Sequence, residues 1–222
     1  VENWSVDNKL QLNPEKCKEL RIDFKRDKQD LEAIKIDNVS LEVVDHAKIL
    51  GLIISDSLQW HHHVNYVIKK ANKRLYCLIQ LKRAKISEKD IVNFYCTCIR
   101  PTLENASQVF HHSLPKYLSD DIERVQKRSL AIIYQGQPYS ESLQQSGLTS
   151  LFEQREELCK SLFSKITSDS NHKLHSLLPP KHSAKYNLRH KRLYELPVTH
   201  TNRFKNTFIQ SMSRCANHVN PL

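Results

Sequence analysis

Residues 60–85 read WHHHVNYVIKKANKRLYCLIQLKRAK. Apolar side chains recur in it at steps of three and four residues: Val64, Val67, Ile68, Ala71, Leu75, Leu78 and Ile79. That period places them on one face of a helix. The stretch therefore predicts a helix from Trp60 to about Arg83, with one apolar face and several basic ones.

The basic faces carry the densest positive charge in the chain, namely Lys69, Lys70, Lys73, Arg74, Lys82, Arg83 and Lys85. These residues fall within about four and a half helical turns. Such a surface can neutralise phosphates without reading a base sequence, and Tyr66 and Tyr76 are candidates to stack on bases. The alternative is an ordinary solvated helix face.

Further helices are predicted downstream. Ser87, with Asp90 three residues later, predicts a capped start for a helix that Pro101 should kink or end. A third helix is predicted from Ser119, with its inner face formed by Ile122, Val125, Ser129 and Ile133. A short helix at 141–145 should stop near Gly147. Thr149 or Ser150 should cap a fifth helix, with an inner stripe of Leu151, Arg155, Leu158, Leu162 and Ile166.

Upstream of Trp60 the period is that of strands. Residues 16–24 alternate between apolar and polar side chains, which is typical of a half-buried strand. Asp37 and Asn38 predict the turn of a hairpin. The run AKILGLII at 47–54 predicts one more strand, with a bend at Gly51.

Together these patterns predict an α+β chain, with a small antiparallel sheet followed by helices. The predicted segments are a β region at 1–58, a helical region at 59–135, a helical extension at 136–180 and a poorly packed basic tail at 181–222. In the tail, a short strand pair and a final helix are possible elements. Lys181, Lys185, Arg189, Lys191 and Arg192 form a second basic patch there, and Arg124, Lys127 and Arg128 form another on the third helix.

Composition narrows the class of protein. The net charge of +10 favours an anionic partner, with nucleic acid ahead of an acidic membrane surface. Hydrophobic residues make up 39% of the chain, and no apolar run approaches the roughly 20 residues of a membrane span. The first residues do not resemble a signal peptide, so we expect an intracellular protein. The six cysteines are too dispersed for a disulfide framework, and we expect them to be reduced.

Four segments, in this order and spacing, resemble the reverse transcriptases of non-LTR (LINE-type) retrotransposons. They are LQLNPEKCKEL at 10–20, SLEVVDHAKILGLIISDSLQWHHHV at 40–64, YVIKKANKRLYCLIQLKRA at 66–84, and FYCTCIRPTLENASQVFHHSLPKYLSDDIERVQKRSLAII at 94–133. The resemblance fades towards the tail. It implies the end of a palm, then a primer-grip hairpin, a helical thumb and a helical extension.

Individual positions carry specific implications of this resemblance. Lys16 and Cys17 fall just after the place of the catalytic aromatic-x-Asp-Asp turn. Leu50, Gly51 and Trp60 fall in or beside the primer grip. The chain departs from the family pattern at Asn105 and Phe110, where relatives tend to have an aromatic residue and a tryptophan.

The resemblance places the catalytic aspartates upstream of Val1, so this chain alone is expected to be inactive and to bind no cofactor. Magnesium is expected only in the complete polymerase. The implied partners are a primer–template of RNA and DNA and the missing upstream portion of the polymerase. The implied location of the parent element is the nucleus.

Two other kinds of site are weaker. Asp120 and Asp121 form the only adjacent aspartate pair, and a helix start explains them better than a catalytic turn. His61, His62 and His63, with His111 and His112, suggest zinc, as do Cys96 and Cys98. Their spacing does not match a structural zinc site, so no metal is expected.

Two functions from different classes remain. The first is a fragment of an RNA-directed DNA polymerase that binds primer and template. The second is a free-standing helical module, derived from such an element, that binds nucleic acid or protein through its own surface.

Overall fold

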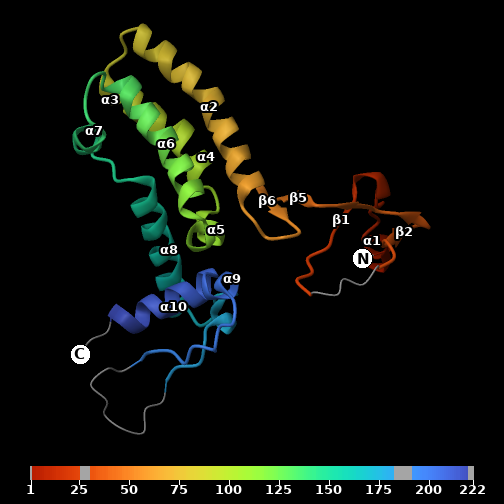
Figure 1. Ribbon diagram of the computed structural model, residues 1–222. Helices are drawn as coiled ribbons and strands as arrows, with labels where there is room; N and C mark the ends of the chain where they lie inside the picture. Colours follow the sequence, from red (N-terminus) through yellow and green to blue (C-terminus); the bar gives the residue numbers. More distant parts are fainter. Residues whose placement is uncertain (1, 26–30, 183–191, 220–222) are drawn as a thin grey trace. The chain divides into compact units, whose positions relative to one another are not determined.

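The computed structural model describes residues 2–25, 31–182 and 192–219 (Figure 1). It has the α+β composition that the sequence predicts. The chain divides into two compact units, residues 1–66 and 67–222. This division falls within helix α2 (His61–Arg83), a few residues beyond the predicted segment boundary at 58. The segments predicted at 59–135, 136–180 and 181–222 all contribute to the second unit.

The first unit contains short elements. They are α1 (Glu2–Asp7), the 3-10 turn η1 (Pro14–Lys16), β1 (Lys18–Leu20), β2 (Lys35–Ile36), β3 (Val39–Ser40), β4 (Glu42–Val44), β5 (His46–Ile49) and β6 (Leu52–Ser55). The six strands form three separate pairs. The predicted strand at 16–24 is therefore wrong in length, because regular pairing stops at Leu20.

The pair β1–β4 is parallel, and not antiparallel as predicted for this region. Lys18 lies opposite Glu42 in the register, and their side chains form an ion pair. The carboxylate of Glu19 accepts hydrogen bonds from Arg21 Nε (2.6 Å) and from the backbone N–H of Ile34 (2.8 Å). These bonds lower the pKa of Glu19. Side-chain contacts thus tie β1 to the segment that leads into β2.

The other two pairs are antiparallel hairpins. Asp37 and Asn38 connect β2 to β3 with positive φ at both residues, which confirms the predicted turn. Two such residues form the turn type whose twist matches that of the flanking strands. The run at 47–54 was predicted as one strand but forms most of the hairpin β5–β6, with Leu50 (φ 49°) and Gly51 (φ 92°) at its turn. The apolar period continues through both strands, so it gives no sign of the reversal between them.

The second unit begins in α2, whose predicted extent is confirmed. Val67, Ala71, Leu75 and Leu78 are buried on one face, as their spacing predicts. The long helix α6 (Lys116–Ile133) lies near it in this unit (Figure 1).

A continuous helical segment follows α2, and Pro101 does not end it. It consists of α3 (Glu88–Phe94), the π-helical turn η2 (Tyr95–Ile99) and α4 (Arg100–Glu104). The Ser87 cap is confirmed, because its hydroxyl accepts from the N–H of Asp90. Proline has no N–H and clashes with the carbonyl four residues earlier. The wider turn immediately before Pro101 relieves this conflict, so the helix continues for another turn.

Next come α5 (Ser107–Phe110), the 3-10 turn η3 (His111–Ser113) and α6. The inner face predicted for α6 is confirmed, since Ile122, Val125, Ser129 and Ile133 are buried. The predicted start at Ser119 is wrong, because α6 begins at Lys116 after Pro115. The fixed φ of a proline suits the start of a helix. Pro115 therefore marks the start of α6, ahead of Asp120 and Asp121, which had suggested a start at Ser119.

The helices α7 (Tyr139–Ser146) and α8 (Leu151–Ser168) follow. Gly147 ends α7 in the left-handed conformation, as predicted. Of the two predicted caps for α8, Ser150 and not Thr149 is the one, and it forms a capping box with Glu153. The inner stripe of α8 differs from the prediction in its middle. Cys159 and Phe163 are buried there, whereas Leu158 and Leu162 are half-buried.

The predicted tail packs more closely than expected. It follows the 3-10 turn η4 (His175–Leu177) and contains α9 (Asn202–Lys205) and α10 (Phe208–Val219). Met212 of α10 and Tyr194 form a buried cluster with Cys159 and Phe163 of α8. Where a strand pair was expected, the described residues of the tail form one isolated antiparallel bridge, between Lys181 and Tyr194. The apolar face of α10 packs against α8, and this contact buries part of the tail.

Asn217 fixes the segment around Tyr194 to α10. Its Oδ1 accepts from the backbone N–H groups of Leu193 and Tyr194, both at 2.8 Å. Its Nδ2 donates to the carbonyl of Tyr194 at 3.0 Å. A single side chain thus satisfies three backbone groups that no regular sheet partner satisfies.

We predict that Asn217→Ala lowers the free energy of unfolding by about 3 kcal/mol, because it removes three hydrogen bonds and each contributes about 1 kcal/mol net. Urea unfolding measures the change. His218→Ala is the matched control, since His218 is the exposed neighbour on the same helix. Equal losses in the two variants would contradict a specific role for the Asn217 amide.

Candidate nucleic-acid interface

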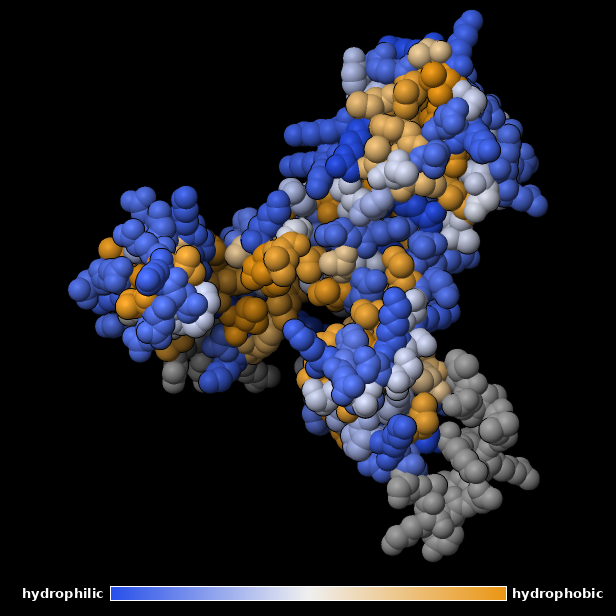
Figure 2. Space-filling view, turned by 180° about the vertical axis from the view of Figure 1, so that it is seen from behind, coloured by the Kyte–Doolittle hydropathy of each residue, from blue (hydrophilic) through white to orange (hydrophobic). Residues whose placement is uncertain are grey.

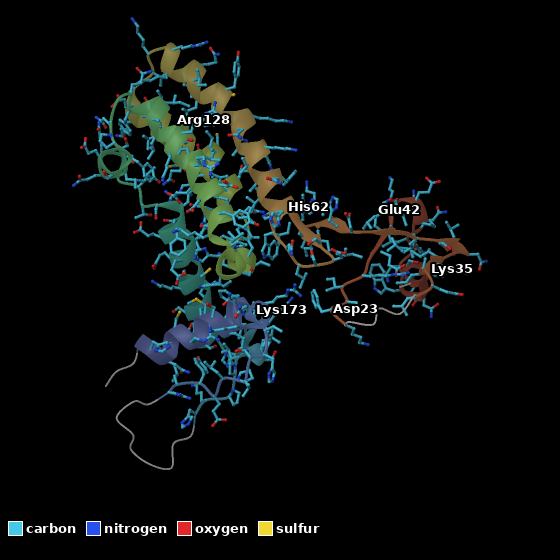
Figure 3. All side chains as sticks on the ribbon, viewed as in Figure 1. Asp23, Lys35, Glu42, His62, Arg128 and Lys173 are labelled. Atoms are coloured by element: carbon cyan, nitrogen blue, oxygen red, sulfur yellow. The ribbon has the colours of Figure 1, made fainter. Side chains whose placement is uncertain are left out.

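Five of the seven basic residues predicted on α2 and just after it are exposed, namely Lys69, Lys70, Lys73, Arg83 and Lys85. Within the described part of the chain, none of these five side chains forms an ion pair with a carboxylate. Figure 3 shows nitrogen-tipped side chains projecting from α2 on the side away from α6. We call these five residues the α2 basic face. Their charges are available to an external anion.

Arg74 belongs to the predicted set but points into the helical unit. Its Nη1 donates to the carbonyl oxygen of Cys98 and to Thr102 Oγ1 (2.5 Å). The carbonyl of Cys98 lies in the π-helical turn, next to the proline that disturbs the backbone pattern. Arg74 therefore joins α2 to η2 and α4, and this contact makes it a structural residue in this arrangement.

Lys82 is also engaged within the unit. Its Nζ donates to the carbonyl oxygen of Ile133, the last residue of α6, at 2.7 Å, and lies 3.3 Å from the carboxylate of Glu88. A cation at the C-terminal end of a helix interacts favourably with its dipole. Lys82 thus stabilises the end of α6, and its charge is less available than those of the α2 basic face.

Lys85 lies at the end of α2 in the left-handed region, with φ 56°. The N–H of Lys85 bonds to the carbonyl of Lys82, and the N–H of Ile86 bonds to the carbonyl of Leu81. This pair of bonds is a Schellman motif, in which glycine is the usual residue at the left-handed position. A lysine there accepts a steric cost and places a charge at the exposed end of the helix.

The two tyrosines proposed for stacking differ in their surroundings. Tyr76, in the second unit, is 65% exposed and therefore presents its ring to solvent. Tyr66, in the first unit, contacts Lys48, whose Nζ lies 2.7 Å from the tyrosine hydroxyl and 4.6 Å from the ring centroid. Tyr76 is thus the better placed of the two for a base.

The residues that resemble a primer grip lie in the first unit. Leu50, at the turn of the β5–β6 hairpin, is 98% exposed. Trp60 is buried immediately before α2, and its ring meets that of His63 edge to face at 6.1 Å. Because its side chain is in solvent, Leu50 does not contribute to the core and is accessible to a partner. Its role in binding stays a prediction.

The secondary basic patches are partly engaged. Arg124 forms an ion pair with Asp121 at 2.8 Å, and Lys127 Nζ lies 5.2 Å from the ring centroid of Tyr139. Arg128 is exposed on α6, where Figure 3 labels it. In the tail Lys181 and Arg192 are exposed, whereas Lys185, Arg189 and Lys191 lie outside the described residues.

Asp120 and Asp121 lie in the second turn of α6, one turn beyond the predicted position at its start. Asp121 pairs with Arg124 on the same helix, and Asp120 is exposed. Side chains of adjacent helical residues diverge. This arrangement does not present two carboxylates to one metal ion.

The histidines suggested as zinc ligands separate into two groups. In the first unit, burial lowers the pKa of His63 to about 4, and the rings of His46 and His62 stack at 4.5 Å. In the second unit, His111 and His112 meet Glu156 of α8, with each Nε2 close to the same carboxylate oxygen (3.0 and 3.2 Å). Two imidazoles and a carboxylate are a ligand set that zinc accepts.

The hydrogen bonds of His111 argue against a metal ion at this cluster. Arg155 Nε donates to His111 Nδ1 at 3.3 Å. A guanidinium can only donate, so Nδ1 is an acceptor and the imidazole proton is on Nε2, where it points to Glu156. That proton occupies the atom with which His111 would bind a metal ion in this arrangement.

A polar network that the sequence pattern does not indicate connects the helices behind the α2 basic face. Gln126 is fully buried on α6, accepts from Tyr95 Oη (2.7 Å) and donates to Tyr139 Oη and to the carbonyl of Thr149 (both 2.9 Å). Burial raises the pKa of both tyrosines. A polar residue at an inward position of a helix was the only available signal, and it does not identify the partners.

Comparisons with known proteins leave the function open, since no family model, no curated protein and no solved structure matches the chain. The resemblance to non-LTR reverse transcriptases therefore stays a prediction. Within the described ranges, none of the helices combines the length and apolar character that a bilayer span requires.

We predict that Arg74→Met lowers the free energy of unfolding by about 2 kcal/mol, because it removes a charged donor from two partly buried acceptors while keeping the apolar stem. Lys73→Met should change it by less than about 0.5 kcal/mol, because Lys73 is an exposed surface residue. Urea unfolding of the two variants measures both changes. If Lys73→Met were the more damaging, the assignment of Arg74 as structural would be wrong.

Proposed function

We propose that this chain binds nucleic acid through the α2 basic face and acts as the thumb-like part of a non-LTR retrotransposon reverse transcriptase. The observation that carries the proposal is the set of five exposed cations at Lys69, Lys70, Lys73, Arg83 and Lys85, none of which forms an ion pair with a described carboxylate. The order and spacing of the four resembling segments support the family. The net charge of +10 agrees with an anionic partner.

The chemistry of the α2 basic face is contact with phosphate. Lys69 and Lys73 are four residues apart, so they lie about 6 Å apart along the helix axis on neighbouring turns. Lysines on flexible stems neutralise phosphates and release counterions without reading bases. Such a surface holds a primer–template by its backbone, which is what a polymerase needs because it must bind every sequence that it copies.

In this proposal, RNA and DNA are the partners, and the polymerase reaction belongs to the complete enzyme with its carboxylates and magnesium ions. The described residues supply grip and position. The nucleus is the proposed location of the parent element, because its target is genomic DNA.

The alternative is a free-standing interaction module that binds a protein. Val109, Tyr117 and Phe152 support it, since each is about half exposed on the helical unit. In that case the exposed apolar side chains, and not the cations, would determine binding, and affinity would depend only weakly on salt.

The test is the affinity of the chain for a fluorescent RNA–DNA duplex, measured by anisotropy over a range of salt concentrations. We predict that Lys69→Ala/Lys70→Ala/Lys73→Ala weakens binding and reduces the slope of log K against log salt by about 2 to 3, because each phosphate contact contributes about 0.9. The loss should be similar for duplexes of different sequence.

The matched control is Lys160→Ala/Lys165→Ala/Lys173→Ala, which removes the same charge from exposed lysines elsewhere in the same unit. This control should keep most of the affinity and the slope. Equal losses in both triple variants would show that net charge, and not the α2 basic face, governs binding. No binding by the wild-type chain would reject the proposal.

A further inference from the structure

A buried chain of polar groups joins η3 to α8. His111 of η3 donates from Nε2 to the carboxylate of Glu156, at 3.0 Å, and accepts at Nδ1 from Arg155 Nε, at 3.3 Å. Arg155 also donates from Nη2 to Ser119 Oγ of α6 at 2.8 Å. Arg155 is completely buried and His111 is only 5% exposed. The contact between Arg155 and His111 therefore lies where solvent does not screen charge, whereas Glu156 is partly exposed.

This arrangement requires a neutral imidazole. Both ring nitrogens of His111 are in use, one as a donor and the other as an acceptor, and only the neutral form can do both. A second proton would go to Nδ1, which faces the N–H of Arg155. Protonation would thus break the hydrogen bond from Arg155 and place two positive charges in contact.

The buried guanidinium has little compensation of its own. Among the described residues, no carboxylate forms an ion pair with Arg155, and its Nη1 has no hydrogen-bond partner. Uncompensated buried charge is costly, and a second cation beside it raises that cost. The protonated state of His111 therefore favours separation of η3 from α8.

The titratable groups around His111 shift its pKa in opposite directions. Glu156 favours protonation of His111, whereas burial, Arg155 and His112 oppose it. Further out, Glu123 of α6 and Glu104 of α4 act on Arg155, and Cys215 of α10 interacts with Glu156. Burial is the largest effect, and together these groups lower the pKa of His111 to about 4.

We propose that the Arg155–His111–Glu156 chain is an acid-sensitive joint, in which one proton taken up by His111 releases η3 and the preceding α5 from α8. The joint does not depend on nucleic-acid binding. Because His111 takes up its proton less readily in the folded chain than in the unfolded one, its stabilising effect is complete above the ordinary pKa of 6.5. The effect is lost as the pH falls from there towards 4.

The test compares the wild-type chain with His111→Gln in urea at pH 7 and at pH 5. Between these values the unfolding equilibrium constant of the wild type should rise more than that of the variant, by a factor on the order of ten. His63, whose pKa burial also lowers, is present in both proteins, so its contribution cancels. His112 meets the same Glu156 oxygen as His111, so His112→Gln is measured alongside to separate its contribution. Hydrogen exchange, corrected for the intrinsic effect of pH, should show early loss of protection at 107–113 and not at 67–82.

Two further variants complete the experiment. Arg155→Met removes the cation that opposes protonation, so its pH dependence should also be weaker than that of the wild type even if His111→Gln does not fold. His218→Gln, at an exposed histidine of α10, should keep the wild-type pH dependence. The proposal is overturned if Arg155→Met, or a folded His111→Gln, loses stability between pH 7 and pH 5 as steeply as the wild type.

Discussion

The amide of Gln126 is the contact on which the helical unit depends. It is fully buried on α6 and bonds to Tyr95 of the π-helical turn, to Tyr139 of α7 and to the carbonyl of Thr149 before α8. One helical turn earlier on α6, Glu123 accepts from Tyr139 and from the N–H groups of Leu151 and Phe152 at the start of α8. Each buried polar group is satisfied by another, and leaving any one unpaired costs about 1–3 kcal/mol. Four segments are thus fixed to α6 by directed bonds in addition to apolar packing.

The same packing decides which basic residues of α2 can meet a partner. Burial of the apolar face sets the rotation of α2, which leaves Lys69, Lys70 and Lys73 in solvent. Arg74, directly after Lys73, turns instead towards the carbonyl of Cys98, and Lys82 turns towards the end of α6. Residues that look equivalent in sequence therefore divide into structural and available cations. The α2 basic face consists of the basic residues that make no such internal hydrogen bond among the described residues.

The first unit is built under a different constraint. Its three strand pairs leave several large apolar side chains about half exposed, among them Ile22, Phe24, Ile34 and Val43. In Figure 2, apolar side chains (orange) lie among hydrophilic ones on the surface of this unit. A two-stranded parallel pair is normally covered on both faces. The unit thus gains little from burial and holds its segments by short-range contacts such as those of Glu19.

Elements whose causes are local can be predicted from the amino-acid sequence. The length of α2, the Ser87 and Ser150 caps, the Gly147 stop and the Asp37–Asn38 turn all follow from neighbouring residues, because capping and turn formation act within a few positions. The sequence also located the α2 basic face, but it could not separate Arg74 and Lys82 from the free lysines.

Features that join distant segments depend on the folded structure and could not be predicted from local patterns. These include the parallel pairing of β1 with β4 and the packing of α10 on α8. The fold also places Arg155 against His111, 44 positions apart in the chain. A periodic pattern states which side of a helix is buried but not what it meets. Hydrogen bonds and charge pairs across the core depend on which segment packs against that buried side, and this is set only when the chain folds.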